Sequence, residues 1–253
     1  MINASETFNG TWTFQANFFN GNGFAQHYVD EGPKDRNPII MLHGEPTWGY
    51  IYRNFIPKLS KKYRIIVPDL MGFGKSETPQ DKKYTLKTHV ENLTGLIKYL
   101  NLNNITFVGQ DWGGPITGAY SIRNIDCVKG FVLINTLFGY SKEPRPKKLT
   151  PWFQWIKKHY EADTLDGILG ELGSTLLSVM KIPNFTNNEV ISENWINAYS
   201  SQFPDRDSCK GAINFPLDAL FNRISPFIIE GLKKGNLKSL CSKPAVLAYG
   251  MQD

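Results

Sequence analysis

The chain has 253 residues, of which 41% are hydrophobic and 20% charged, so it is long enough for one large globular domain or a domain with an insertion. Its net charge of +5 comes with no arginine-rich or aromatic-basic motif, and its three cysteines have no CxxC spacing; these features argue against nucleic-acid binding, a disulfide framework and a zinc site. The N-terminus has no leader pattern and no apolar run nears the roughly 18 residues of a membrane helix, so we expect a cytoplasmic protein without a membrane partner.

Strand signals begin near the N-terminus. Residues 11–19 and 25–30 flank a turn-forming Asn-Gly-Asn-Gly sequence and predict a hairpin or meander. Continuous apolar runs then predict central strands of a parallel sheet covered on both faces, with a helical pattern over 84–100 between them. The runs are 39–42, 65–67, 105–108, 131–134 and 245–248. The sequence therefore predicts an α/β fold with a mostly parallel sheet.

The strand pattern stops after residue 134 and resumes only at 245. The intervening sequence contains a helical pattern over 189–199, and we interpret 138–214 as a helical cap inserted over the strand ends. The α/β core then comprises 1–137 and 215–253. Ligands of open α/β sheets bind at the carboxyl ends of the strands, so we expect the chemistry beneath this insertion.

A carboxylate occupies a special position in Val108-Gly109-Gln110-Asp111-Trp112-Gly113-Gly114. The run has the Gly-x-Ser-x-Gly form of a nucleophile elbow, with Asp111 in place of the serine, between a predicted strand and a predicted helix. A carboxylate there can displace a leaving group from saturated carbon and form an enzyme ester, which water must hydrolyse. The alternative is an ordinary helix-capping aspartate.

A second motif, His43-Gly44-Glu45-Pro46-Thr47-Trp48, follows the strand predicted at 39–42. It resembles the oxyanion-hole turn of α/β hydrolases, and this resemblance implies that the backbone N–H groups of Glu45 and Trp112 form the oxyanion hole. We interpret His43 as a structural residue of this turn rather than a base. The Asp69-to-Ser76 run resembles another loop of the superfamily, and its glycine spacing fits neither of the common nucleotide-binding motifs.

These motifs, in this order and together with Tyr52-Arg53, resemble the haloalkane dehalogenase family of the α/β-hydrolase superfamily over about residues 24–253. The resemblance implies that Asp111 is the nucleophile, that the indole N–H of Trp112 binds the departing halide, and that no cofactor or metal takes part. An indole donates but does not accept hydrogen bonds, which suits an anion in an apolar pocket. Bulky packing is the alternative role for Trp112.

The second halide donor is less directly indicated. Some relatives have an asparagine where this chain has Glu45, and an ionised carboxylate cannot donate a hydrogen bond. Resemblance to the branch with two halide-binding tryptophans points to Trp152, with Trp155 as the runner-up; either could instead be a core aromatic. The same branch has its catalytic acid after the late strand, which implies Asp253, because Asn135-Thr136 offers no carboxylate after the earlier strand.

The family's base is a histidine that follows this acid. None of the chain's four histidines, His27, His43, His89 and His159, has that position. We expect that the sequence is truncated before a last strand, the base and a last helix, and turnover by the 253 residues is therefore in doubt. If the chain end is authentic, Asp111 can be alkylated but the ester persists, because no base activates water.

The sequence thus predicts hydrolysis of small haloalkanes to an alcohol and halide, with the haloalkane, water and halide as the only partners. An epoxide hydrolase is the nearest rival, with Tyr140, Tyr160 and Tyr199 available to protonate an opening oxirane. A non-catalytic binder with a hydrolase fold is the remaining alternative.

Overall fold

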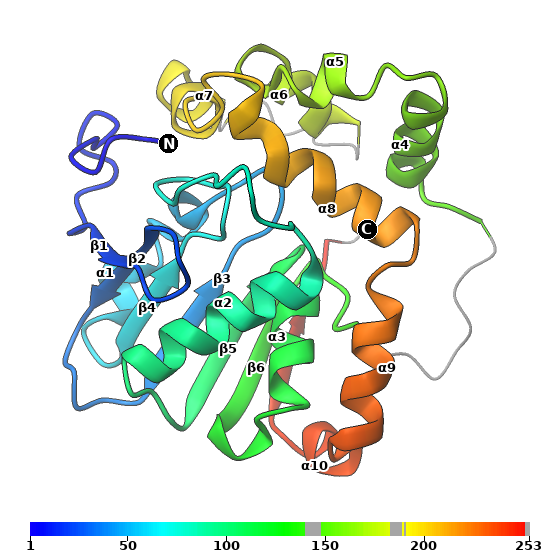
Figure 1. Cartoon of the computed structure of the whole chain (residues 1–253). Helices are drawn as coiled ribbons and strands as arrows, with labels where there is room; N and C mark the ends of the chain where they lie inside the picture. The colour runs from blue at the N-terminus through cyan, green and yellow to red at the C-terminus, as the bar shows by residue number, and fades with distance from the viewer. Residues whose placement is uncertain (140–147, 183–188, 190, 251–253) are drawn as a thin grey trace.

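In the described residues, seven strands form one sheet in the order β1-β2-β4-β3-β5-β6-β7 (Figure 1). The computed structural model describes residues 1–139, 148–182, 189 and 191–250. The strands are β1 (Asn17–Phe19), β2 (Gln26–Glu31), β3 (Pro38–Leu42), β4 (Arg64–Pro68), β5 (Ile105–Gln110), β6 (Val128–Ile134) and β7 (Ala245–Ala248).

Helices α2 and α3 lie against one face of this sheet, and α4 to α8, the upper helices, lie above its strand ends in Figure 1. Short 3-10 turns occupy Gly49–Tyr52, Ile125–Cys127 and Asp207–Cys209. The helices are α1 (Ile56–Leu59), α2 (Leu86–Tyr99), α3 (Gly113–Ser121), α4 (Pro151–Glu161), α5 (Asp166–Leu169), α6 (Leu172–Lys181), α7 (Glu193–Ser200), α8 (Lys210–Leu220), α9 (Ser225–Lys234) and α10 (Leu237–Cys241).

The pairing of the strands confirms the predicted mostly parallel α/β fold. β3 to β7 pair in parallel, whereas β2 is antiparallel to both β1 and β4. In the centre of the sheet Ile40 faces Phe107 across β3 and β5, and Phe107 faces Phe131 across β5 and β6. Ile40 and Phe107 are fully buried, as expected for strands with both faces covered. Because β3 and β5 are parallel neighbours, the turns that follow them begin side by side at the carboxyl ends of these strands.

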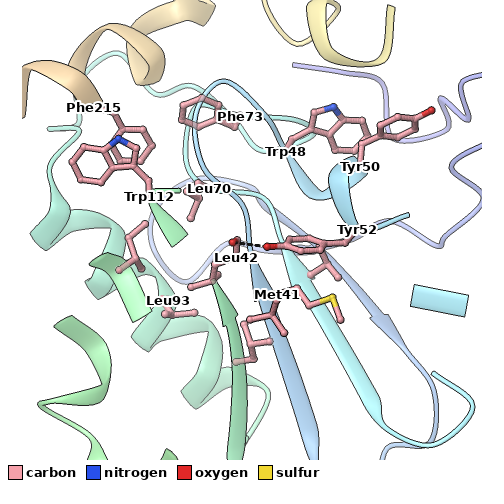
Figure 2. Packing of buried hydrophobic residues seen from close by; sticks show 14 of the residues in the cluster. Met41, Leu42, Trp48, Tyr50, Tyr52, Leu70, Phe73, Leu93, Trp112 and Phe215 are labelled. Atoms are coloured by element: carbon pink, nitrogen blue, oxygen red, sulfur yellow. Dashed lines mark hydrogen bonds between the residues drawn. The ribbon is translucent and has the colours of Figure 1, made fainter. Parts of the chain in front are cut away.

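The first predicted strand is shorter than expected, since 11–19 narrows to Asn17–Phe19. The reason is Trp12, which is buried instead of alternating along a strand. Its backbone N–H donates to Thr7 O, and its indole packs edge-on against Trp48 with ring centroids 4.8 Å apart. Burial of this large ring outweighs the β propensity of the neighbouring residues. Figure 2 shows Trp48 stacked on Tyr50 in the same aromatic cluster.

Strand β7 corrects the expectation of a strand covered on both faces. Among the described residues it pairs with β6 alone and lies at the edge of the sheet. The side chains of Val246 and Leu247 are 59% and 65% exposed. A continuous apolar run shows that a strand is present but does not show where the strand lies in the sheet.

Capping residues set the ends of the predicted helices. The Thr85 side chain accepts a hydrogen bond from the Thr88 N–H, so α2 begins at Leu86 rather than at 84. Ser192 likewise caps α7, which begins at Glu193 although the helical pattern extends back to 189. The predicted cap boundary at residue 214 falls within α8, and the division into a core and a cap stays a prediction. No helix in the described ranges is long and apolar enough to span a bilayer.

Candidate active site

The nucleophile elbow is a tight turn between β5 and α3. Asp111 follows the last residue of β5 and has a φ of +49°, a left-handed conformation that is strained for a residue with a side chain. A Cβ at Gly113 would lie 2.2 Å from Leu42 O, so only glycine allows α3 to start this close to β3. The structure thus gives Asp111 the strand-turn-helix setting that the motif requires.

The oxyanion turn, residues 43–48, lies directly against Asp111. The backbone N–H of Glu45 donates to Asp111 Oδ1 at 2.8 Å, and the neighbouring Trp112 N–H also lowers the pKa of the Asp111 carboxyl. Close approach requires Gly44, because a Cβ there would be 2.1 Å from Asp111 Oδ1. The structure therefore brings together the two amides and the carboxyl that the sequence singled out.

Two half-buried carboxyls lie at this site, those of Asp111 and Glu45. Burial raises the pKa of Asp111, and the hydrogen bonds from the Glu45 and Trp112 amides offset part of that rise. Burial, and after it the Asp111 charge, raises the pKa of Glu45 well above its ordinary value. Two neighbouring carboxylates that are partly shielded from water repel each other, so the two amides favour Asp111 as the anion and Glu45 as the neutral acid. From the sequence, Glu45 was treated as ionised and therefore unable to donate a hydrogen bond. In its neutral form, Glu45 can donate one.

Glu45→Gln is expected to stabilise the fold at pH 8 and to leave its stability nearly unchanged near pH 4. Because the pKa of Glu45 is higher in the folded than in the unfolded chain, ionisation opposes folding once the pH exceeds the unfolded value. The cost grows until the pH reaches the folded value, and glutamine removes it. Urea unfolding at both pH values measures the difference, with exposed Glu171→Gln as the control. Equal stability of Glu45→Gln and the parent at pH 8 would show that Glu45 is not held neutral.

His43 is fixed within the oxyanion turn by both of its ring nitrogens. Nδ1 lies 2.9 Å from Gly44 O, and Nε2 lies 2.9 Å from the Leu70 N–H. Nδ1 therefore carries the proton and Nε2 accepts. Burial lowers the pKa of His43. These contacts support the structural interpretation of His43, since neither nitrogen is free to take a proton.

Asp69, whose role the sequence analysis missed, is a buried carboxylate that holds the residue after the oxyanion turn. The Asp69 side chain is fully buried and accepts hydrogen bonds from the backbone N–H groups of Gly49 and Lys75, each at 2.8 Å. It also lies 2.8 Å from His27 Nδ1. Although burial opposes ionisation, His27 and the other partners lower the pKa of Asp69 overall. The motif that contains Asp69 was recognised, but only its glycine spacing was interpreted.

Trp112 packs face to face with Phe215 of α8. The ring centroids are 4.4 Å apart and the planes differ by 15° (Figure 2). Both side chains are buried, and His89 of α2 lies 4.5 Å beyond Phe215. Burial lowers the pKa of His89 to about 3, so this ring is neutral. Phe215 was not predicted, and no local signal distinguishes it from any other core phenylalanine.

Trp152 and Trp155, the two candidates for the second halide donor, lie on α4. Their rings stack on each other with centroids 5.6 Å apart, and Trp155 also contacts His159 at 4.4 Å. Helix α4 packs against α8, the helix that carries Phe215. Among the described residues, Trp152 stacks on Trp155 whereas Trp112 stacks on Phe215, so the structure does not bring the two predicted halide donors into ring contact.

The predicted acid, Asp253, lies outside the described residues, but the segment leading to it is tied to the site. Tyr249 OH donates to Thr136 O, and the Gly250 N–H donates to Asn135 Oδ1 at 3.0 Å. Thr136 Oγ1 in turn donates to the backbone oxygen of Asp111. The ends of β6 and β7 are therefore linked to the elbow by hydrogen bonds. Within the described ranges, no cluster of His, Cys, Asp and Glu side chains could hold a metal ion.

Comparison with known proteins gives one family model, described as the alpha/beta hydrolase fold, which matches residues 37–167. A haloalkane dehalogenase of Psychrobacter cryohalolentis is 35% identical over 195 residues, covering 76% of this chain and 59% of the relative. One of Mycobacterium marinum is 31% identical over 229 residues, covering 90% and 72%. A cis-3-alkyl-4-alkyloxetan-2-one decarboxylase of Xanthomonas campestris pv. campestris is 37% identical over 252 residues, covering 91% and 77%.

Solved structures agree on the fold. A tetrameric haloalkane dehalogenase from Paraglaciecola agarilytica superimposes with a TM-score of 0.72 at 24% identity, covering 96% of this chain and 87% of that one. Some curated dehalogenases are matched over only part of their length, since the chain spans 59% of the Psychrobacter protein and 44% of a mycobacterial one.

Proposed function

The chain belongs to the haloalkane dehalogenase family of the α/β-hydrolase superfamily, and on that premise we propose that it hydrolyses small haloalkanes to an alcohol and halide. One observation carries the proposal: a half-buried carboxyl at a strained elbow receives the Glu45 amide and is followed in the chain by a buried tryptophan. A serine hydrolase would have a hydroxyl there. A carboxylate nucleophile suits attack on saturated carbon.

The first step is displacement of the halide. The Glu45 amide holds Asp111 Oδ1, which leaves Oδ2 to attack the halogen-bearing carbon. The new bond joins Oδ2 to carbon, and the carbon–halogen bond breaks with its electron pair leaving on the halide. We assign the halide to the indole N–H of Trp112, with Trp152 or Trp155 of α4 as the second donor. Residues 138–214 are proposed as the cap that keeps this site apolar.

The second step is hydrolysis of the resulting ester. Water gives a proton to the base and attacks the Asp111 carbonyl carbon, and the Glu45 and Trp112 amides stabilise the oxyanion that develops. The bond from this carbon to the alkyl oxygen then breaks, the alcohol leaves with a proton, and the Asp111 carboxylate is restored. We propose that Asp253 orients the histidine base that the family uses.

The four histidines of the chain have other contacts. His27 binds Asp69, and His43 is held at both ring nitrogens. His89 has a pKa of about 3, and the half-buried His159 of α4 has its Nδ1 2.8 Å from Thr164 Oγ1.

A second activity has a specific observation in its favour. The relative from Xanthomonas, named as a decarboxylase of cis-3-alkyl-4-alkyloxetan-2-ones, is 37% identical over nearly the whole chain. The same Asp111 could act on a strained oxetanone ring. An epoxide hydrolase remains the rival predicted from the elbow, and two of its candidate proton donors occupy different settings: Tyr199 is buried and Tyr160 is 47% exposed, while Tyr140 lies outside the described residues.

One comparison separates these activities. The chain is incubated with 1-bromobutane, with styrene oxide and with a cis-3,4-dialkyl oxetan-2-one, and released bromide, diol and carbon dioxide are measured. We expect at least one bromide per chain with 1-bromobutane and little product from the others. Product from the oxirane alone or the oxetanone alone would overturn the proposal and identify the rival.

Trp112→Phe is expected to slow bromide release by about 10²-fold, because the ring is kept but the N–H donor is lost. The phenyl ring can still stack on Phe215, so the fold should persist. Single-turnover bromide release measures the rate, and Trp195→Phe on α7 is the control for removal of a buried tryptophan away from the elbow. A Trp112→Phe rate equal to the parent would show that this indole binds no halide.

A further inference from the structure

The side chain of Gln202 joins three parts of the molecule. It follows α7 and is buried, with only 2% of its surface exposed. Its Nε2 donates to Pro46 O in the oxyanion turn and to Tyr199 O in α7, both at 2.9 Å. Its Oε1 accepts from the Gly74 N–H, also at 2.9 Å. One amide thus connects an upper helix, the oxyanion turn and the loop after β4.

The orientation of this amide follows from its partners. Two carbonyl oxygens and one N–H surround it, so the nitrogen must face the carbonyls and the oxygen must face the N–H. The reversed orientation would place an oxygen against two acceptors and a donor against a donor. The three contacts therefore specify a single placement of the side chain, with both donors used.

A second link runs parallel to the first. The indole N–H of Trp48, at the end of the oxyanion turn, donates to Ala198 O of α7 at 2.7 Å. Within the turn, Thr47 donates to Gly44 O through both its N–H and its hydroxyl, each at 3.0 Å. The core holds the other end of the turn through His43, whose ring nitrogens contact Gly44 O and the Leu70 N–H. The Glu45 amide therefore lies between a part fixed by the core and a part fixed by α7.

We infer that Gln202 is a positioning residue, which holds the oxyanion turn so that the Glu45 N–H points at Asp111 Oδ1. Through it, the segment after α7 sets the geometry of an amide more than 150 residues earlier in the sequence. The structural part of this inference stands on hydrogen bonds alone, whereas its effect on reactivity rests on the proposed function.

The decisive experiment measures the Glu45 amide itself. Hydrogen exchange of the Glu45 N–H, followed by residue-resolved NMR, should be about 10-fold faster in Gln202→Met, because a lost hydrogen bond changes local opening by roughly that factor. Methionine keeps the length of the side chain but not its donors. Exposed Gln80 also donates to two carbonyls, and Gln80→Met is the control that should leave Glu45 exchange unchanged. If Gln202→Met fails to fold, the shorter Gln202→Asn replaces it.

The pH profile of Asp111 alkylation is a second measurement, and a loss of stability alone would not shift it. The Glu45 hydrogen bond lowers the pKa of Asp111, so a loosened turn should shift the pH profile of Asp111 alkylation by 1-bromobutane to higher pH. Glu45 and His43 are the ionisable groups on the neighbouring turn, while Asn135 and Thr136, which follow β6, do not titrate. The pH profile is then repeated with Glu45→Gln added to the parent and to Gln202→Met. This substitution removes the titration of Glu45, the ionisable group nearest to Asp111.

The outcomes separate the inference from the proposed function. Unchanged Glu45 exchange in Gln202→Met, or an alkylation profile identical to the parent, overturns the role of Gln202 while leaving the dehalogenase proposal intact. A parent chain that is never alkylated refutes the proposed function, and the exchange measurement still decides whether Gln202 positions the turn.

Discussion

Asp111→Asn is expected to release no bromide from 1-bromobutane above the uncatalysed rate, a loss on the order of 10⁶ if it matches removal of other covalent nucleophiles. The amide is far less nucleophilic than the carboxylate and cannot form the ester. The fold should become more stable above neutral pH, because the substitution removes a half-buried carboxyl whose pKa is raised in the folded chain. Single-turnover bromide release and urea unfolding at pH 8 measure the two effects.

The matched control is Asp126→Asn, which changes an exposed aspartate after α3. It should leave both bromide release and stability as in the parent. Full bromide release by Asp111→Asn would place the nucleophile elsewhere and would remove the basis for the mechanism.

Asp69→Ala is expected to lower the free energy of unfolding by about 3–5 kcal/mol, because three buried hydrogen-bonding groups each lose their acceptor at roughly 1–3 kcal/mol apiece. The substitution leaves the Gly49 and Lys75 N–H groups and the His27 ring without an acceptor in a fully buried setting. Because the pKa of Asp69 is lowered by folding, its contribution is present at neutral pH and is lost as the pH falls through its folded value. Urea unfolding at pH 7 measures the loss.

Asp35→Ala, in the exposed turn after β2, should change the unfolding free energy by less than about 0.5 kcal/mol. If Asp69→Ala lowers the free energy of unfolding by less than about 1 kcal/mol, the hydrogen bonds to Asp69 do not stabilise the oxyanion turn.

Local sequence signals were sufficient for the parts of the site that are contiguous in the chain. The elbow at Asp111 and the turn containing Glu45 each follow an apolar strand, and parallel strands end at a common edge, so the two motifs were expected to meet. Four of the five apolar runs correspond to strands inside the sheet of the described residues, and the fifth, β7, is a strand at its exposed edge.

The parts that sequence reasoning missed depend on contacts between distant residues. Phe215 and Gln202 have side chains that any core could contain, and their importance comes from what they touch: Trp112 in one case and Pro46 in the other. Asp69 was visible in a motif, yet its pairing with His27 depends on the register of β2 against β4. Strand propensity in 11–19 was overridden by burial of Trp12. Each of these depends on tertiary packing, which periodicity does not encode.

The chemical role of Asp111 is tested most directly by locating the mark that the reaction leaves on the protein. The chain is incubated with 1-bromobutane in ¹⁸O-labelled water, digested, and the peptide that contains Asp111 is sequenced by mass spectrometry. We predict either a butyl ester on Asp111, if the ester persists, or ¹⁸O in its carboxyl group, if water cleaves the ester. Bromide release with an unmarked Asp111 would contradict carbon attack by this residue.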